Sequence, residues 1–160
     1  FSEEVFEVSP FLFGLLGSAQ GIGAVLAVPL VTGYVNFMKP SVQQLIATVG
    51  YGFAVMIFAL APSYTVAFFS LGILGIMHLI SASNLNSVVQ LQVDEEMRGR
   101  VMAIYLVGVL GPAPFAGLAM GWLVSSFGPR LVVALSGSIL ALSAVVLWLR
   151  GKFSDLNATN

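Results

Sequence analysis

The chain has 160 residues, of which 58% are hydrophobic and 8% charged, and its mean hydropathy is +0.99. A soluble fold of this length could not bury so large an apolar share. The net charge of −1 and the lack of a basic stripe exclude a nucleic-acid-binding protein. The absence of cysteine excludes disulfides, thiolate metal sites and cysteine nucleophiles. The composition therefore predicts an integral membrane protein, and we expect no cofactor and no metal.

The chain begins with Phe1, and residues 1–10 lack the basic region and apolar core of a signal peptide. We therefore interpret the chain as a fragment whose N-terminal part is missing. Residues 1–9, with their three glutamates, are expected to form an extracytoplasmic loop before the first span.

Five apolar runs without Asp, Glu, Lys or Arg follow, and charges or Pro, Gly and Ser turn signals bound each one. A helix needs roughly 20 apolar residues to cross a bilayer, and a charge at its centre costs about 3 kcal/mol. The runs lack the alternation of barrel strands. With short connections, they predict an all-α antiparallel bundle of five transmembrane helices over 10–150. The expected spans are about 10–34, 42–60, 64–91, 101–124 and 131–149, and a polar tail occupies 151–160.

The basic residues are distributed unevenly between the two ends of such a bundle. Only Arg130 falls on one side, and the other basic residues fall on the opposite side: Lys39, Arg98, Arg100, Arg150 and Lys152. Because Lys and Arg concentrate in cytoplasmic loops, we expect the N-terminus outside and the C-terminal tail in the cytoplasm.

The first, third and fourth spans are rich in glycine. Gly17 and Gly21, and likewise Gly117 and Gly121, have the GxxxG spacing that lets two membrane helices approach closely. A single GxxxG can also arise by chance in a glycine-rich span. We expect these three spans inside the bundle, and the second and fifth spans, richer in large aliphatic residues and Phe, against lipid.

The third span ends in a concentration of polar residues, which at membrane depth normally face a bundle interior or a wet cavity. At about 100° per residue, Ser83, Asn86 and Gln90 share one stripe, and Ser81 and Asn84 form a neighbouring stripe. They can line a substrate cavity or join helices through hydrogen bonds worth roughly 1 kcal/mol each. The cavity candidates are His78, Ser81, Ser83, Asn84, Asn86, Gln90 and, in the first span, Gln20.

His78 is the only histidine of the chain, and no Asp or Glu lies deep inside a span. Histidine can relay protons near neutral pH, but it can equally pack as a neutral side chain. In the fourth span, Pro112 and Pro114 free backbone groups and predict a bend. We consider them a possible hinge, although membrane helices tolerate proline widely.

The segment LQVDEEMRGRVMAIY connects the third and fourth spans. Asp94 and Glu95 fit a helix N-terminus or the turn before it, where acids suit the positive end of the helix dipole. Gly99 relieves the turn, and Arg98 and Arg100 anchor the inner face. Helix capping by the acids and membrane orientation by the arginines are sufficient to explain these residues without a role in transport.

These residues also resemble a known family. The order of GLLGSAQGIGAVLAVPL, LQVDEEMRGRVMAIYLVG and GLAMGWLVSSFGPR is similar to the C-terminal half of major facilitator superfamily transporters, especially the branch of enterobactin exporters and macrolide-efflux-like proteins. Val93 stands where that branch often has proline, and GYVNFMKPS lacks the Asp-Arg pair usual in the family's loop after its eighth helix. The residues that match the branch's element between its tenth and eleventh helices are Gln92, Asp94, Glu95, Gly99 and Arg100.

The resemblance implies helices 8–12 of a twelve-helix fold, with the third span at the central cavity and the first and fourth against the other half. It also implies proton-driven efflux of a small amphipathic molecule, such as a drug or siderophore, across a bacterial inner membrane. The implied partners are lipid, the N-terminal half of the same transporter, the substrate and protons. The coupling carboxylate would lie in the missing part. A structural or channel-type membrane subunit is the alternative, and a membrane enzyme lacks the convergent groups it would need.

Overall fold

The computed structural model describes residues 10–33 and 37–157, which are almost entirely helical and contain no β-strand. The helices are α2 (Pro10–Thr32), α3 (Pro40–Leu60), α4 (Tyr64–Gln92), α5 (Arg98–Leu110), α6 (Ala113–Phe127) and α7 (Pro129–Leu149), and the 3₁₀ helix η2 (Lys152–Asn157) follows. Within these residues, five helical segments are long and apolar enough to cross a membrane, with α5 and α6 together forming the fourth. The expected all-α bundle of five membrane-spanning helices is confirmed. Residues 1–9 and Tyr34, which were assigned to a loop and to the first span, lie outside the described part.

Proline and serine mark where the helices begin. Pro40 and Pro129 occupy the first turn of α3 and α7, where a missing N–H leaves no bond unmade. Ser63 precedes α4, and its side chain accepts a hydrogen bond from the backbone N–H of Val66 at 3.5 Å. These signals fix the short connections that make the spans antiparallel.

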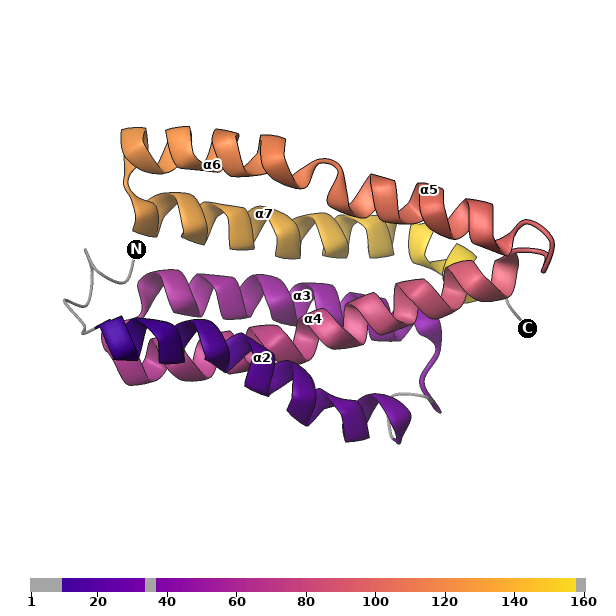
Figure 1. Cartoon of the computed structure of the whole chain (residues 1–160), viewed down its shortest axis with the longest axis horizontal. Helices are drawn as coiled ribbons and strands as arrows, with labels where there is room; N and C mark the ends of the chain where they lie inside the picture. Colours follow the sequence, from indigo (N-terminus) through magenta and orange to yellow (C-terminus); the bar gives the residue numbers. More distant parts are fainter. Residues whose placement is uncertain (1–9, 34–36, 158–160) are drawn as a thin grey trace.

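Helix α3 lies at the centre of the described bundle (Figure 1). It packs against α4 on one side and α7 on the other, and α2 packs against α4. The described residues of α5 and α6 include none that is buried, whereas α3 buries several small or polar side chains. The fourth span is therefore peripheral among the described helices, and its packing against the other half of a transporter stays a prediction. The expectation that the second span faces lipid is wrong, because α3 is the central helix of the described bundle. Hydrophobicity fails as a guide here because the packing face of α3 consists of small residues such as Ala47, Ala54 and Ala59.

The close helix contacts involve other glycines than the two GxxxG pairs. A Cβ atom on Gly52 would lie 2.7 Å from the carbonyl oxygen of Gly137, and one on Gly137 would lie 2.7 Å from that of Gly52. A Cβ atom on Gly23 would likewise overlap the backbone of α4, and one on Gly75 would overlap the backbone of α2. A Cβ atom built on the GxxxG residues Gly17, Gly21, Gly117 or Gly121 would have no atom of another described helix within 4 Å. These four glycines therefore pack against no described helix, and their contact with the other half of a transporter stays a prediction.

The fourth span is interrupted where its two prolines lie. Helix α5 ends at Leu110 and α6 begins at Ala113, with Gly111 and Pro112 between them (Figure 1). Neither Pro112 nor Pro114 has the N–H that would bond the carbonyl four residues earlier. The interruption follows from this loss, and a hinge at these residues stays a prediction.

Candidate functional site

A hydrogen-bonded cluster joins α3 and α4 around the buried side chain of Gln44. Its Nε2 donates to Ser81 Oγ at 2.7 Å and to Thr48 Oγ1 at 3.1 Å. The buried Asn84 donates through Nδ2 to Gln44 Oε1 at 3.1 Å and to the carbonyl oxygen of Pro40 at 2.9 Å. Ser81 and Asn84, the second polar stripe of the third span, therefore bind one helix to another.

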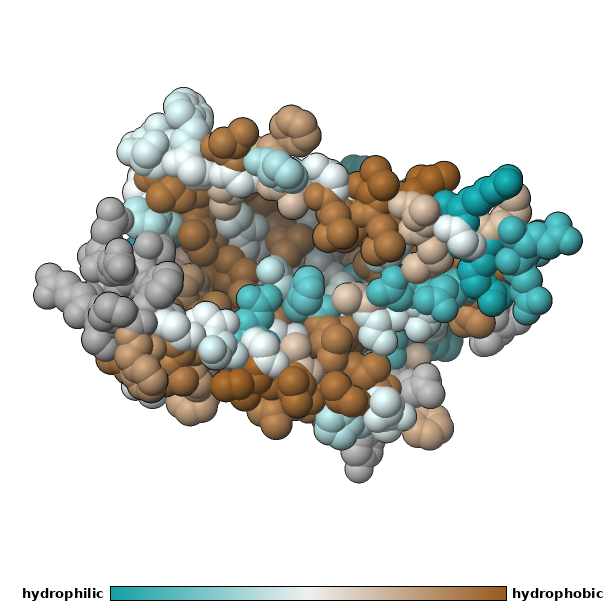
Figure 2. All heavy atoms as spheres, viewed as in Figure 1, coloured by the Kyte–Doolittle hydropathy of each residue, from teal (hydrophilic) through white to brown (hydrophobic). Residues whose placement is uncertain are grey.

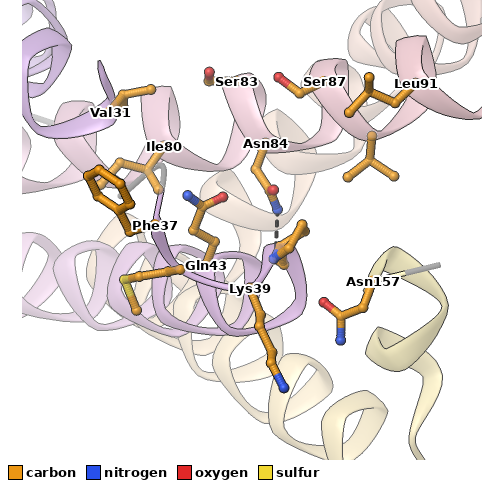
Figure 3. Close-up of a pocket in the computed structure, with 13 residues that line it drawn as sticks. Val31, Phe37, Lys39, Gln43, Ile80, Ser83, Asn84, Ser87, Leu91 and Asn157 are labelled. Atoms are coloured by element: carbon orange, nitrogen blue, oxygen red, sulfur yellow. Dashed lines mark hydrogen bonds between the residues drawn. The ribbon is translucent and has the colours of Figure 1, made fainter. Parts of the chain in front are cut away.

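A cavity of about 630 Å³ lies beside this cluster, where the last turn of α2, the first turn of α3 and the C-terminal half of α4 meet (Figure 3). Ser83, Asn84 and Ser87 contribute its polar wall from α4. In the close-up, Gln43 of α3 extends toward Asn84, and the amino group of Lys39 points away from α4. Asn157 of η2 adds a further amide to the lining. The apolar part of the wall comes from Val31, Phe37, Met38, Pro40, Ile80, Val88 and Leu91. The cavity thus combines hydroxyl and amide groups with an aliphatic surface.

A second hollow lies between α4 and α7 and has α3 as its floor. Its volume is about 240 Å³, and its lining includes Tyr51, His78 and Ser81. The rings of Tyr51 and His78 are 6.1 Å apart at an angle of 46°. An adjoining hollow of about 400 Å³ shares Gln44, Thr48 and Leu140 with it and extends to η2. Figure 2 shows the molecule hollowed between the α6–α7 side and the α4 side, with hydrophilic patches among brown apolar surface.

Asn86 and Gln90 are absent from the linings of all three hollows. At about 100° per residue, Asn86 is displaced by about 200° from Asn84, so it lies on the face of α4 that turns away from α3. Asn86 is partly buried and Gln90 is exposed, and neither side chain has a hydrogen-bond partner within the described ranges. Gln20 of α2 is exposed too, and among the described residues its side chain has no such partner. The structure thus brings His78, Ser81, Ser83 and Asn84 to hollows and leaves these three amides outside them.

The polar residues of α3 were missed in the sequence analysis, which placed no functional candidate on the second span. Gln44, Thr48 and Tyr51 recur at spacings of four and three residues and so lie on one helical face. That spacing in an otherwise apolar span was the signal that could have identified them.

The loop element between α4 and α5 lies at the surface. The backbone N–H of Met97 donates to the carbonyl oxygen of Asp94 at 3.0 Å, and α5 begins at Arg98. Asp94 and Glu95 thus occupy the turn before the helix. Together with Arg98, Gly99 and Arg100 they are exposed, and in the described part of the chain none of them forms an ion pair.

Comparison with known proteins places this geometry in context. The sequence profile of the Major Facilitator Superfamily matches residues 2–157. The chain is 28% identical over 145 residues to the enterobactin exporter EntS of Salmonella choleraesuis, a match that covers 90% of this chain and 35% of that protein. The enterobactin exporter EntS of Citrobacter koseri is 27% identical over the same length. The chain thus spans about a third (35%) of the length of these curated relatives. No solved structure matches it.

Proposed function

The chain belongs to the major facilitator superfamily, and on this premise we propose that it is the C-terminal part of a proton-driven exporter of a small amphipathic molecule. In this proposal the described helices act as one half of an alternating-access transporter in a bacterial inner membrane. The relatives that the chain resembles are named as enterobactin exporters, which supports outward transport of a siderophore-like or drug-like cargo.

The observation that carries the proposal is the division of polar side chains on α4. Ser81 and Asn84 are hydrogen-bonded to Gln44. Asn86 and Gln90 have no side-chain partner in the described part of the chain. Polar groups in a membrane helix are costly unless they meet a partner or water. Amide groups without partners on this face of α4 therefore support a wet path for cargo there.

The cavity beside α4 supports an amphipathic cargo in particular. Ser83 and Ser87 offer hydroxyl groups next to the aliphatic side chains of Ile80 and Leu91. A ligand that presents both polar edges and apolar surface satisfies such a lining, because small-molecule sites combine apolar walls with a few polar groups.

The exposed face of α5 and α6 supports a further set of helices as partner. None of the described residues in these two helices is buried, and the Gly117 and Gly121 faces have no neighbour within 4 Å in the described chain. A glycine face lets a second helix approach closely in lipid. We assign this face to the N-terminal half of the same transporter, since the relatives are nearly three times as long as their match to this chain.

Transport by the full-length protein tests the proposal. Inside-out membrane vesicles containing it should accumulate enterobactin or a fluorescent amphipathic dye when respiration makes their lumen acidic. Addition of a protonophore should abolish accumulation, because uphill transport needs the proton gradient. Accumulation that only reaches equilibrium and ignores the protonophore would favour the channel-type alternative. Vesicles without the protein provide the background.

A further inference from the structure

Helix α3 begins without a local cap. Lys39 occupies the N-cap position, and its side chain makes no capping hydrogen bond. Lysine could not cap in any case, because its ammonium group has no acceptor. Pro40 has no N–H, so the amide of Ser41 is the first in the helix that requires a partner. Ser41 is only 3% exposed, which removes water as an easy substitute.

The partner comes from the other end of the chain. The backbone N–H of Ser41 donates to Asn157 Oδ1 at 3.1 Å, and Asn157 Nδ2 donates to Ser41 Oγ at 2.9 Å. The two residues are 116 positions apart. Asparagine is among the best N-cap residues because its side-chain oxygen accepts an N–H of the first helical turn.

The C-terminal segment is folded so that Asn157 can reach this position. Gly151 adopts a φ of 71°, which is the left-handed conformation that reverses the chain after a helix. The rings of Trp148 and Phe153 then meet edge to face at 6.1 Å and hold η2 against α7. Helix η2 packs on both α3 and α7, and Asn157 also lines the large cavity (Figure 3).

From these contacts we propose that Asn157, supplied by the C-terminal tail, caps the N-terminus of α3 in place of Lys39 and is a positioning residue for the cluster that joins α3 and α4. Pro40 precedes Ser41, and its carbonyl oxygen accepts the hydrogen bond from Asn84. Gln44 lies one turn further along α3 and accepts the other. Fixing the first turn of α3 therefore fixes both acceptors of Asn84. The capping and the positioning follow from the contacts alone and do not depend on the proposed function.

Hydrogen exchange on the purified full-length protein in lipid nanodiscs tests the cap. In Asn157→Leu, which lacks both polar atoms, exchange in peptides covering the first turn of α3 should accelerate about fivefold, the effect of losing a typical cap. Asn157→Asp keeps the accepting oxygen and should stay close to the parent protein. Ser154→Ala is the matched control in the tail, because the Ser154 hydroxyl bonds only within the tail, to the Gly151 carbonyl.

A rescue variant separates capping from any other role of Asn157. Lys39→Ser places a good cap at the position before Pro40, so exchange in Lys39→Ser/Asn157→Leu should return to the parent rate. Unchanged exchange in Asn157→Leu, or equal acceleration with and without Lys39→Ser, would overturn the proposal. If Asn157→Leu does not fold, the double variant and Asn157→Asp decide the matter. Because exchange is measured without transport, failure of the exporter proposal would leave these results intact.

Discussion

Two asparagines only two positions apart on α4 differ in their surroundings. Asn84 is buried and donates to both Gln44 and Pro40, whereas Asn86 has no hydrogen-bond partner within the described ranges. A sequence stripe places both on a helix but does not tell which stripe meets a neighbour. That assignment needs the position of α3, which depends on contacts far apart in the chain.

Replacing each asparagine with leucine should therefore affect a different property, export for Asn86 and stability for Asn84. Asn86→Leu should impair export and leave the melting temperature nearly unchanged, because no partner on a described helix loses its bond. Asn84→Leu should lower stability by about 1 kcal/mol, since two acceptors lose their donor in an apolar environment. Melting of the detergent-solubilised full-length protein and whole-cell efflux, measured for both variants, provide the comparison.

The proposed substrate path along the Asn86 face of α4 depends on the Asn86 result. If Asn86→Leu is destabilised and its remaining folded fraction exports normally, then Asn86 joins helices and the substrate path lies elsewhere. Asn84→Leu serves as the control that shows how a lost helix-joining bond affects melting in the same protein.

At the scale of helices, the contact between α2 and α4 depends on one glycine of α4 more than on another. A Cβ atom on Gly75 would overlap the backbone of α2 at Gln20, whereas one on Gly72 would meet only the Ala19 carbonyl oxygen, at 3.9 Å. Gly75→Ala should therefore destabilise the protein by about 1–3 kcal/mol through overpacking. Gly72→Ala, one turn away, should be tolerated. Thermal melting of the two variants compares them, and equal behaviour would mean that α2 and α4 do not approach this closely.

The loop element between α4 and α5 allows a comparison of two arginines. Arg100 lies in the first turn of α5 within the family-like element, and Arg150 caps the end of α7; both are exposed. Arg100→Ala should reduce export by the full-length protein more than Arg150→Ala does. Arg150 only anchors the end of α7 at the membrane interface, so its loss should affect export little. Efflux rates normalised to the amount of protein in the membrane give the measurement. Equal losses would reduce the element to a topology signal.

The number and order of the membrane-spanning segments could be predicted from the sequence, because charges, prolines and turn residues bound every apolar run. The division of the fourth segment into α5 and α6 was expected only as a bend. The central place of α3 could not be predicted, since its packing face uses Ala47, Ala54 and Gln44 rather than a conspicuous motif. The GxxxG pairs were conspicuous but meet no described neighbour. Glycine permits a close contact only on the face that a neighbour approaches, and that face is set by how the helices cross. The capping of α3 by Asn157 could not be predicted either, because Asn157 and Ser41 lie 116 residues apart in the chain.

At the scale of the whole molecule, the structure gathers the basic residues at one end. Four of them lie toward the same end of the bundle: Arg98 and Arg100 at the start of α5, Lys39 before α3, and Lys152 in η2 (Figure 1). Arg130 at the start of α7 lies at the opposite end. Because Lys and Arg concentrate on the cytoplasmic side, this arrangement predicts that the α4–α5 loop and the C-terminal tail are in the cytoplasm.

Cysteine labelling tests this orientation, because the chain contains no cysteine of its own. In the full-length protein with any other cysteines removed, a cysteine at Glu96 should resist a membrane-impermeant thiol reagent in intact cells and react once the membrane is opened. A cysteine at Glu4, expected on the outer side, should react in intact cells. The second site controls for reagent access, and the opened membrane controls for burial at the first, since Glu96 is exposed. Labelling at Glu96 with protection at Glu4 would invert the molecule, and the cavity beside Ser83 and Ser87 would then lie near the outer rather than the cytoplasmic face.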